Sequence, residues 1–236
     1  MRRAAHVRPS PTDAVLLGLR DVSFSYGRDP VLRGATLAVR EGETVALLGP
    51  SGAGKSTLLA CMAGLRRPTG GVVELWGEDL ARAGRDRLAE LRLRTFGFVL
   101  QDGGLLDELS LRENVELPLR LAGVPAREAA GRAGGVLDAL GIDAETGGRR
   151  PAEVSGGQQQ RAAVARAVVH GPAVVFADEP TGALDETSSS TVVDLLVRAT
   201  SRAGCALVMV THNPALAARM DRRLHVHDGH VVEDAA

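Results

Sequence analysis

Lysine is almost absent from this sequence. Its 236 residues include 28 basic residues, of which one, Lys55, is a lysine and all the others are arginines. The 29 acidic residues bring the net charge to −1, so the chain has no overall positive field to attract nucleic acid or anionic lipid, and no nucleic-acid partner is expected. The positive charge is carried on planar guanidinium groups, with a single compact ammonium group at residue 55.

Cysteine and long apolar runs are also scarce. Cys61 and Cys205 are too few for a disulfide framework, and their apolar neighbours favour buried, reduced thiols. The longest uncharged stretch, residues 203–218, contains glycine, histidine, asparagine and proline and is shorter than the roughly 18 apolar residues of a membrane span. A hydrophobic fraction of 44% is enough for the core of one large domain. We therefore expect a soluble α/β domain over residues 15–236, preceded by a flexible leader over residues 1–14.

Strand and helix patterns alternate along most of the chain. Val22–Tyr26 alternates apolar residues with serine, and Thr44–Leu48 is a short apolar run typical of a buried central strand. The pattern is mostly helical over about residues 102–154, and strands and helices alternate again afterwards. Such alternation on both sides of a helical insert predicts a mixed, mostly parallel sheet that carries a helical subdomain. The other expected strands are 35–39, 71–76, 96–100, 174–177, 206–210 and 224–227, and the main expected helices are 55–63, 86–94, 157–170 and 187–203.

A glycine-rich loop follows the Thr44–Leu48 strand. Residues 49–56 fit the pattern GxxxxGK[ST], with a buried strand before the loop and a helix after it. Glycine allows consecutive backbone N–H groups to converge on an anion, and the helix N-terminus adds the positive end of its dipole. Lys55 is expected to reach the β- and γ-phosphates, and Ser56 to offer its hydroxyl to Mg²⁺. The residues predicted to hold the nucleotide phosphates are Gly49, Pro50, Ser51, Gly52, Ala53, Gly54, Lys55, Ser56 and Thr57.

A second motif lies at the end of a later apolar strand. Ala173–Ala177 leads directly into Asp178 and Glu179. A buried strand that ends near the phosphate loop places Asp178 where it can contact Mg²⁺ and Glu179 where it can polarise an attacking water. By itself an acidic strand end is a weak signal, because turns often contain acidic residues. Together with the phosphate loop it predicts a nucleotide-hydrolysing site.

These motifs, with Val154-Ser155-Gly156-Gly157-Gln158 between them, resemble the ATPase subunit of ATP-binding cassette (ABC) transporters over about residues 16–233. The resemblance implies a P-loop NTPase core, an N-terminal antiparallel β subdomain, and ATP and Mg²⁺ as ligands. Tyr26 matches the aromatic residue that stacks on adenine, and Asp185 lies in the loop that crosses the dimer. Gln101 matches the glutamine that senses Mg²⁺ and faces the membrane partner. The implied catalytic residues are Glu179, His212 and Gln101, and the implied Mg²⁺ ligands are Ser56, Gln101 and Asp178.

The signature segment supports a second phosphate-binding end. Ser155 is placed to cap a helix that begins near Gly157, and Gly156 and Gly157 leave the N–H groups of its first turn bare. In the family this segment, Ser155 to Gln158 here, closes over the ATP of a second copy of the chain, so that a head-to-tail dimer holds two nucleotides. ATP would then drive dimerisation and hydrolysis would reverse it.

Longer strings are similar to one subgroup of cassettes, which serves lipoprotein release, macrolide export and cell division. The similarity lies in residues 155–161 and 177–185, and Leu105-Leu106 fits it as well. Two departures are Val154, in place of a leucine, and Asp107-Glu108, in place of a proline. Valine still fills an apolar pocket at a cost of under about 1.5 kcal/mol, so ATPase activity is expected to persist.

The main functional hypothesis is therefore an ATPase subunit bound to a separately encoded permease on the cytoplasmic side of the membrane. One alternative is an ATPase that transmits force through its membrane partner to an extracellular process and transports nothing. Another is a soluble cassette that serves DNA repair or translation. The substrate, the transport direction and the identity of the permease are not encoded in this chain.

Overall fold

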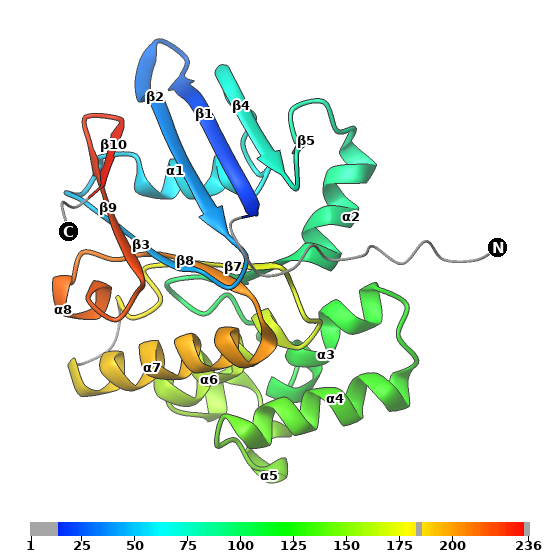
Figure 1. Ribbon diagram of the computed structural model, residues 1–236. Coiled ribbons are helices and arrows are strands. Elements are labelled where there is room, and N and C mark those ends of the chain that lie inside the picture. The colour runs from blue at the N-terminus through cyan, green and yellow to red at the C-terminus, as the bar shows by residue number, and fades with distance from the viewer. Residues whose placement is uncertain (1–13, 183–185, 234–236) are drawn as a thin grey trace.

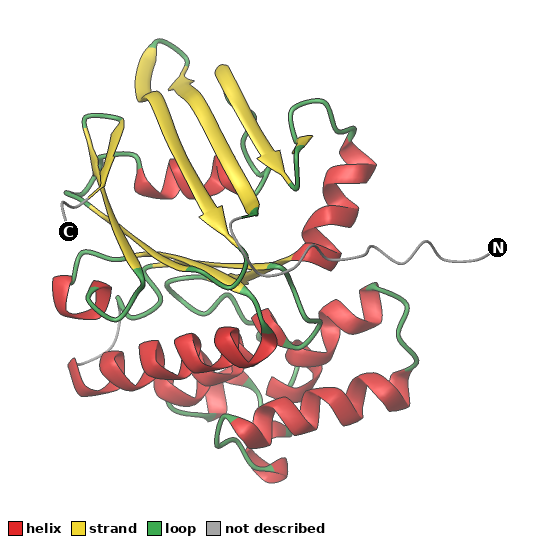
Figure 2. Ribbon diagram, viewed as in Figure 1, coloured by secondary structure: helices red, strands yellow, loops and turns green. Residues whose placement is uncertain are grey.

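The strands form two sheets in the computed structural model, which describes residues 14–182 and 186–233 (Figures 1 and 2). Neighbouring strands of the central sheet are parallel except for the last pair, which is antiparallel. Their order across the sheet is β6 (Phe96–Val99), β7 (Val174–Asp178), β8 (Ala206–Val210), β3 (Thr44–Leu48), β9 (Arg222–His227) and β10 (His230–Glu233). The second sheet is antiparallel, in the order β2 (Asp29–Arg40), β1 (Val15–Tyr26), β4 (Gly70–Leu75) and β5 (Glu78–Asp79).

The central strands are buried on both faces. Successive side chains point to opposite faces, so Val45 and Leu47 of β3 join one core cluster while Ala46 and Leu48 join another. All five residues of β3 and all five of β8 are buried. Polar side chains of these strands are therefore confined to the strand ends.

The two cores belong to different layers. The antiparallel sheet and α1 (Lys55–Met62) cover one face of the central sheet, and a layer of helices covers the other (Figure 1). Between β5 and β6 lies α2 (Arg85–Thr95). The remaining helices are α3 (Leu111–Leu121), α4 (Ala126–Ala139), α5 (Ala144–Gly147), the 3₁₀ helix η1 (Pro151–Glu153), α6 (Gly156–Val168), α7 (Glu186–Ala203) and α8 (Pro214–Ala217).

This architecture confirms the predicted α/β class, with its antiparallel subdomain and helical insert. The predicted strand bounds were wrong at the N-terminus, where β1 and β2 are each 12 residues long. Register shifts interrupt the β1–β2 pairing, and Asp21 adopts a φ of 50°. These bulges break the period of two that a strand prediction depends on. The exact domain boundaries, 102–154 for the helical insert included, stay a prediction.

Both cysteines are buried and neither forms a disulfide, as predicted. Burial raises the pKa of the Cys61 thiol to about 11, with Arg66 opposing the shift. None of the helices within residues 14–182 and 186–233 is both long enough and apolar enough to cross a membrane.

Asn114 holds the loop that leads from β6 into the helical insert. The side chain is completely buried. Its Oδ1 accepts from the Leu106 amide at 2.8 Å, and its Nδ2 donates to the carbonyls of Leu106, Leu109 and Ser110 at 3.0–3.2 Å. Ser110 begins α3 with a capping box to Glu113, which the sequence Ser110-Leu111-Arg112-Glu113 predicts. One side chain thus satisfies the backbone of a loop that has little regular structure.

Replacing Asn114 with leucine, which has a similar volume, is expected to lower the free energy of unfolding by about 2–4 kcal/mol, because buried backbone groups lose their partners. Urea denaturation measures the change. Leu121→Ala, at a site 65% exposed on the same helix, is the control and should shift stability by less than about 0.5 kcal/mol. A loss for Asn114→Leu no larger than that of the control would contradict this account of the loop.

Candidate functional site

The loop between β3 and α1 depends on glycine at two positions. Gly49 has φ 143°, and a Cβ there would lie 2.2 Å from the carbonyl oxygen of Val226 in β9. Gly54 is the N-cap of α1 with φ 97°, and a Cβ there would lie 3.0 Å from Val31. The first turn of α1 contains no acidic residue to cancel its positive dipole end. The predicted turn is confirmed, with backbone that no other residue type adopts easily.

Lys55 is buried inside this loop, with 6% of its surface exposed. Its Nζ donates to the carbonyl of Gly49 at 2.9 Å and to that of Pro50 at 2.8 Å. An ammonium group has three N–H donors, so one remains after these two bonds. The other predicted loop residues lie on the same turn: Ser51 and Gly52 are exposed, Ala53 is buried, Ser56 is exposed, and Thr57 is half-buried in the first turn of α1.

Ser56 meets the end of β7. Its Oγ donates to Oδ1 of Asp178 at 3.0 Å. Burial raises the pKa of the Asp178 carboxyl, and the nearby Glu179 adds to the shift, while the hydrogen bond from Ser56 and the charge of Lys55 oppose it. A half-buried carboxylate whose charge is poorly solvated therefore lies beside a hydroxyl oxygen. These are hard oxygen donors of the kind Mg²⁺ prefers.

Glu179 follows Asp178 in a strained backbone conformation. Its φ is 45°, which is uncommon for a residue other than glycine. The Glu179 amide donates to the Val210 carbonyl at 3.1 Å, and the Glu179 carbonyl accepts from the Gly182 amide at 3.0 Å. His212 lies just beyond β8, and its Nδ1 is 3.7 Å from Oε2 of Glu179. The ends of β7 and β8 thus bring two of the three predicted catalytic side chains together, those of Glu179 and His212.

Gln101 lies in the loop that follows β6, the strand next to β7 in the central sheet. Its side chain lies over Gly182, because a Cβ on that glycine would come within 2.8 Å of Gln101 Nε2. The absence of a side chain at residue 182 therefore allows Gln101 to reach the loop that follows Glu179.

Tyr26 ends β1 with 48% of its surface exposed. Its ring packs edge-on against Phe24, with the centroids 4.9 Å apart, and the Arg66 guanidinium lies 5.6 Å from its centroid. An exposed aromatic ring is available for stacking, and the adenine-stacking role stays a prediction.

The signature segment forms the predicted helix start. Ser155 is the N-cap of α6, its Oγ accepts from the Gln158 amide at 3.3 Å, and Gln158 Oε1 accepts from the Ser155 amide at 2.9 Å. The helix begins at Gly156, one residue earlier than predicted. Its first turn holds no acidic residue, so a second bare, positive helix end exists in the chain.

The predicted site residues fall into two groups. The first group lies at the ends of β7 and β8 and in the phosphate loop, and consists of Lys55, Ser56, Asp178, Glu179 and His212. The second group is the start of α6, where Ser155 and Gln158 are hydrogen-bonded to each other. Asp185, predicted to cross the dimer, lies outside the described residues.

Two residues of α6 that contact these loops were missed. Gln160 and Arg166 bond to backbone carbonyls near Glu179 and Gln101. A polar Gln160 on the apolar side of α6 was the signal that was available.

Known proteins share this sequence and fold. The family model described as ABC transporter matches residues 32–182. The chain is 47% identical to the lipoprotein-releasing system ATP-binding protein LolD of Geobacter metallireducens, over 93% of this chain and 99% of that protein. It is 45% identical to the pyoverdine export ATP-binding/permease protein PvdT of Pseudomonas syringae pv. tomato and 44% identical to the macrolide export ATP-binding/permease protein MacB of Marinobacter nauticus. These two matches cover 94% and 93% of this chain, which spans about a third of the length of either relative.

A solved structure has the same architecture. It is a dimeric ATP-binding cassette in a post-hydrolysis state, bound to ADP and Pi, and it superposes with a TM-score of 0.82 at 33% identity. The superposition covers 92% of this chain and 97% of the other. Together with the family match and the identity to LolD, this likeness shows that the chain belongs to the ABC transporter family, as one of its ATPase cassettes.

Proposed function

We propose that the chain is the ATP-hydrolysing subunit of a membrane transporter. Two copies pair head to tail around two ATP molecules, and the pair drives a membrane permease from the cytoplasmic face. The observation that carries the proposal is the meeting of Lys55, Ser56, Asp178, Glu179 and His212 at the carboxyl edge of the central sheet. Relatives named for pyoverdine export, macrolide export and lipoprotein release support a role in moving a substrate at a membrane.

The phosphate loop binds the nucleotide through its backbone N–H groups and the start of α1. Lys55 keeps two donors on the loop carbonyls and directs its third toward a phosphate oxygen. The proposed Mg²⁺ ligands are Ser56, Asp178 and Gln101, the last from the loop that follows β6. Bound there, the ion neutralises charge on the phosphates. A cation also suits Asp178, because the charge of its half-buried carboxylate is poorly solvated.

Glu179 acts on the attacking water. Its carboxylate accepts a water proton as the water oxygen bonds to the γ-phosphorus, and the bond from that phosphorus to ADP breaks. His212, at 3.7 Å from the carboxylate, orients it and contacts the γ-phosphate. The bare N-terminus of α6 in the second copy, with Ser155 and the following glycines, binds the same phosphates from the opposite side. Tyr26 stacks on the adenine.

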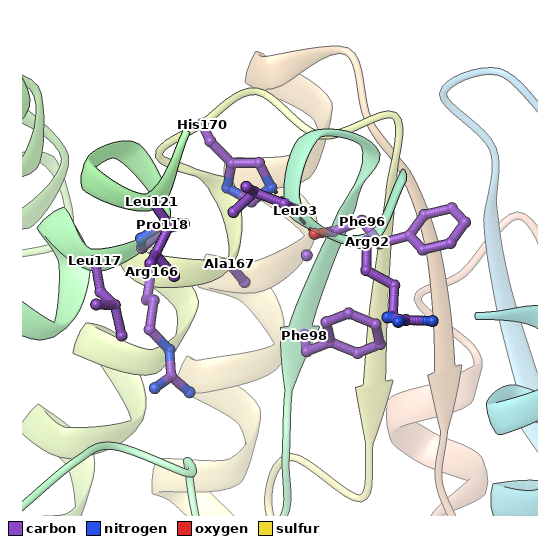
Figure 3. A pocket seen from close by; sticks show the side chains of 11 residues that line it. Arg92, Leu93, Phe96, Phe98, Leu117, Pro118, Leu121, Arg166, Ala167 and His170 are labelled. Carbon is purple, nitrogen blue, oxygen red and sulfur yellow. Dashed lines mark hydrogen bonds between the residues drawn. The ribbon is translucent and has the colours of Figure 1, made fainter. Parts of the chain in front are cut away.

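A cavity of about 290 Å³ is the proposed seat of the permease. Figure 3 shows Leu117, Pro118 and Leu121 of α3 on one side of it and Phe98 and Arg92 on the other. The cavity lies along β6, the edge strand of the central sheet. Leu100 and Leu106, which lie on either side of Gln101 in the sequence, are exposed apolar residues as well. An apolar face next to Gln101 suits a partner that responds to nucleotide.

Glu179→Gln tests the catalytic role. The amide cannot accept the water proton, so kcat is expected to fall by about 10²-fold or more while ATP is still bound. ATP hydrolysis by the purified protein and size-exclusion chromatography with ATP measure the two effects, and an ATP-dependent dimer is expected in the variant. Hydrolysis at the wild-type rate would refute the assignment of Glu179.

Lys55→Arg tests the need for a compact ammonium. Two carbonyls at 2.8–2.9 Å enclose Nζ, and a planar guanidinium is too wide and wrongly forked for that space. We expect binding of a fluorescent ATP analogue to weaken by about tenfold or more, as for the loss of one charge-assisted hydrogen bond. Arg127→Lys is the matched control, because it also exchanges the two cations but at an exposed position on α4. Equal affinity of Lys55→Arg and wild type would show that charge alone suffices.

Leu121→Asp tests the permease site. Leu121 is 65% exposed, so the change should not unfold the chain, but a charge on this apolar surface should abolish co-purification with the permease while ATP binding persists. Val232→Asp, also at an exposed position (59%) but on β10, is the control. Loss of the permease from both variants, or from neither, would contradict the proposed seat.

A further inference from the structure

Gln160 is a buried polar residue on the apolar side of α6. Only 5% of its surface is exposed, and Ala163, Val164 and Ala167, which follow it at helical spacing, are buried too. A buried amide costs free energy unless it is hydrogen-bonded, so its partners are informative.

The Gln160 amide contacts two loops of the proposed ATP site. Its Nε2 donates to the Pro180 carbonyl in a short hydrogen bond and lies 3.5 Å from the Gln101 carbonyl. Both partners are acceptors, so the NH₂ group must face them. Its Oε1 faces Gly103, where a Cβ would come within 3.0 Å. A single side chain thus joins the loop after β7 to the loop after β6.

The bond to Pro180 acts directly next to Glu179. Glu179 has the left-handed φ of 45°, a conformation that persists only where its surroundings enforce it. Its amide is held by Val210, and its carbonyl is held by Gly182. Gln160 holds the next carbonyl along the chain. The direction in which the Glu179 side chain leaves the backbone therefore depends on α6 as well as on β8.

Arg166 ties the same helix to the second loop. Its guanidinium donates to the Gly103 carbonyl at 2.8 Å and to the Gly104 carbonyl at 2.6 Å. Arg166 also lines the cavity in Figure 3. The helix α6, which Ser155 caps, is thereby bonded to the backbone of the loops after β6 and β7.

We propose that Gln160 is a positioning residue for ATP hydrolysis: by holding the Pro180 and Gln101 carbonyls it fixes the positions of Glu179 and Gln101 relative to α6, the helix that Ser155 caps. The inference rests on the proposed ATPase function and deepens it. In the proposed dimer, nucleotide bound by the second copy contacts Ser155 of this chain. Through Gln160, that contact would then influence the positions of Glu179 and Gln101 in this chain.

The test compares Gln160→Met and Gln160→Glu with wild type. Methionine keeps the volume and removes the donors, and glutamate is isosteric but sets carboxylate oxygens against two carbonyl oxygens. We expect kcat to fall by about tenfold or more in both variants while the Kd for a fluorescent ATP analogue stays within about twofold. Thr200→Val is the matched control, because Thr200 is buried and its Oγ1 donates to the carbonyls of Leu196 and Val197 in its own helix, α7. It should lower Tm without lowering kcat.

A second measurement separates positioning from dimer formation. Gln160→Met is combined with Glu179→Gln, and ATP-dependent dimerisation is followed by chromatography. A dimer that persists supports a defect in the hydrolytic step. A dimer that is lost, a Kd that weakens as much as kcat, or a kcat within twofold of wild type would overturn the inference. If wild type itself does not hydrolyse ATP, the proposed function falls and the inference falls with it. If wild type is active and Gln160→Met is equally active, the inference alone is refuted.

Discussion

The burial of both faces of the central sheet is the constraint on which the site depends. β3 and β8 are enclosed by apolar layers above and below, so they have no place for a polar side chain except at their ends. Parallel pairing brings the carboxyl ends of β3, β7 and β8 to one edge. Lys55, Asp178 and His212 are collected there by strand direction. The position of the site thus follows from the burial of the sheet and the parallel direction of its strands. The glycines of the phosphate loop then shape the backbone that binds phosphate.

Motifs with local geometry could be predicted from the sequence. The phosphate loop, the capping boxes at Ser110 and Ser155, and the acidic end of β7 each depend on residues within a few positions of one another. Their local hydrogen bonds and backbone conformations do not depend on the segments that pack around them. The strands β1 and β2 were underestimated because bulges, which depend on pairing with a distant segment, break the alternation of apolar and polar residues.

Contacts across the sheet could not be predicted. The left-handed backbone conformation of Glu179 depends on its hydrogen bonds to Val210 and Gly182. Glutamate has no intrinsic preference for a positive φ, so the residue type does not predict this conformation. The role of Gln160 follows from two carbonyls that lie 59 and 20 residues away in sequence. Val154, a departure from the family pattern, packs against the helical core as an apolar residue should, so it changes little.

The burial of Lys55 has a consequence for the chemistry of the whole surface. Because the chain has one lysine, and its Nζ lies beneath the carbonyls of Gly49 and Pro50, no side-chain amine is offered to solvent anywhere else on the protein. Acylation, carbamylation and amine-directed cross-linking can therefore reach a lysine only by entering the phosphate loop. Arginine side chains are inert to these reagents at neutral pH, so the side-chain charges at the surface stay unchanged under conditions that would neutralise the lysines of a lysine-rich relative.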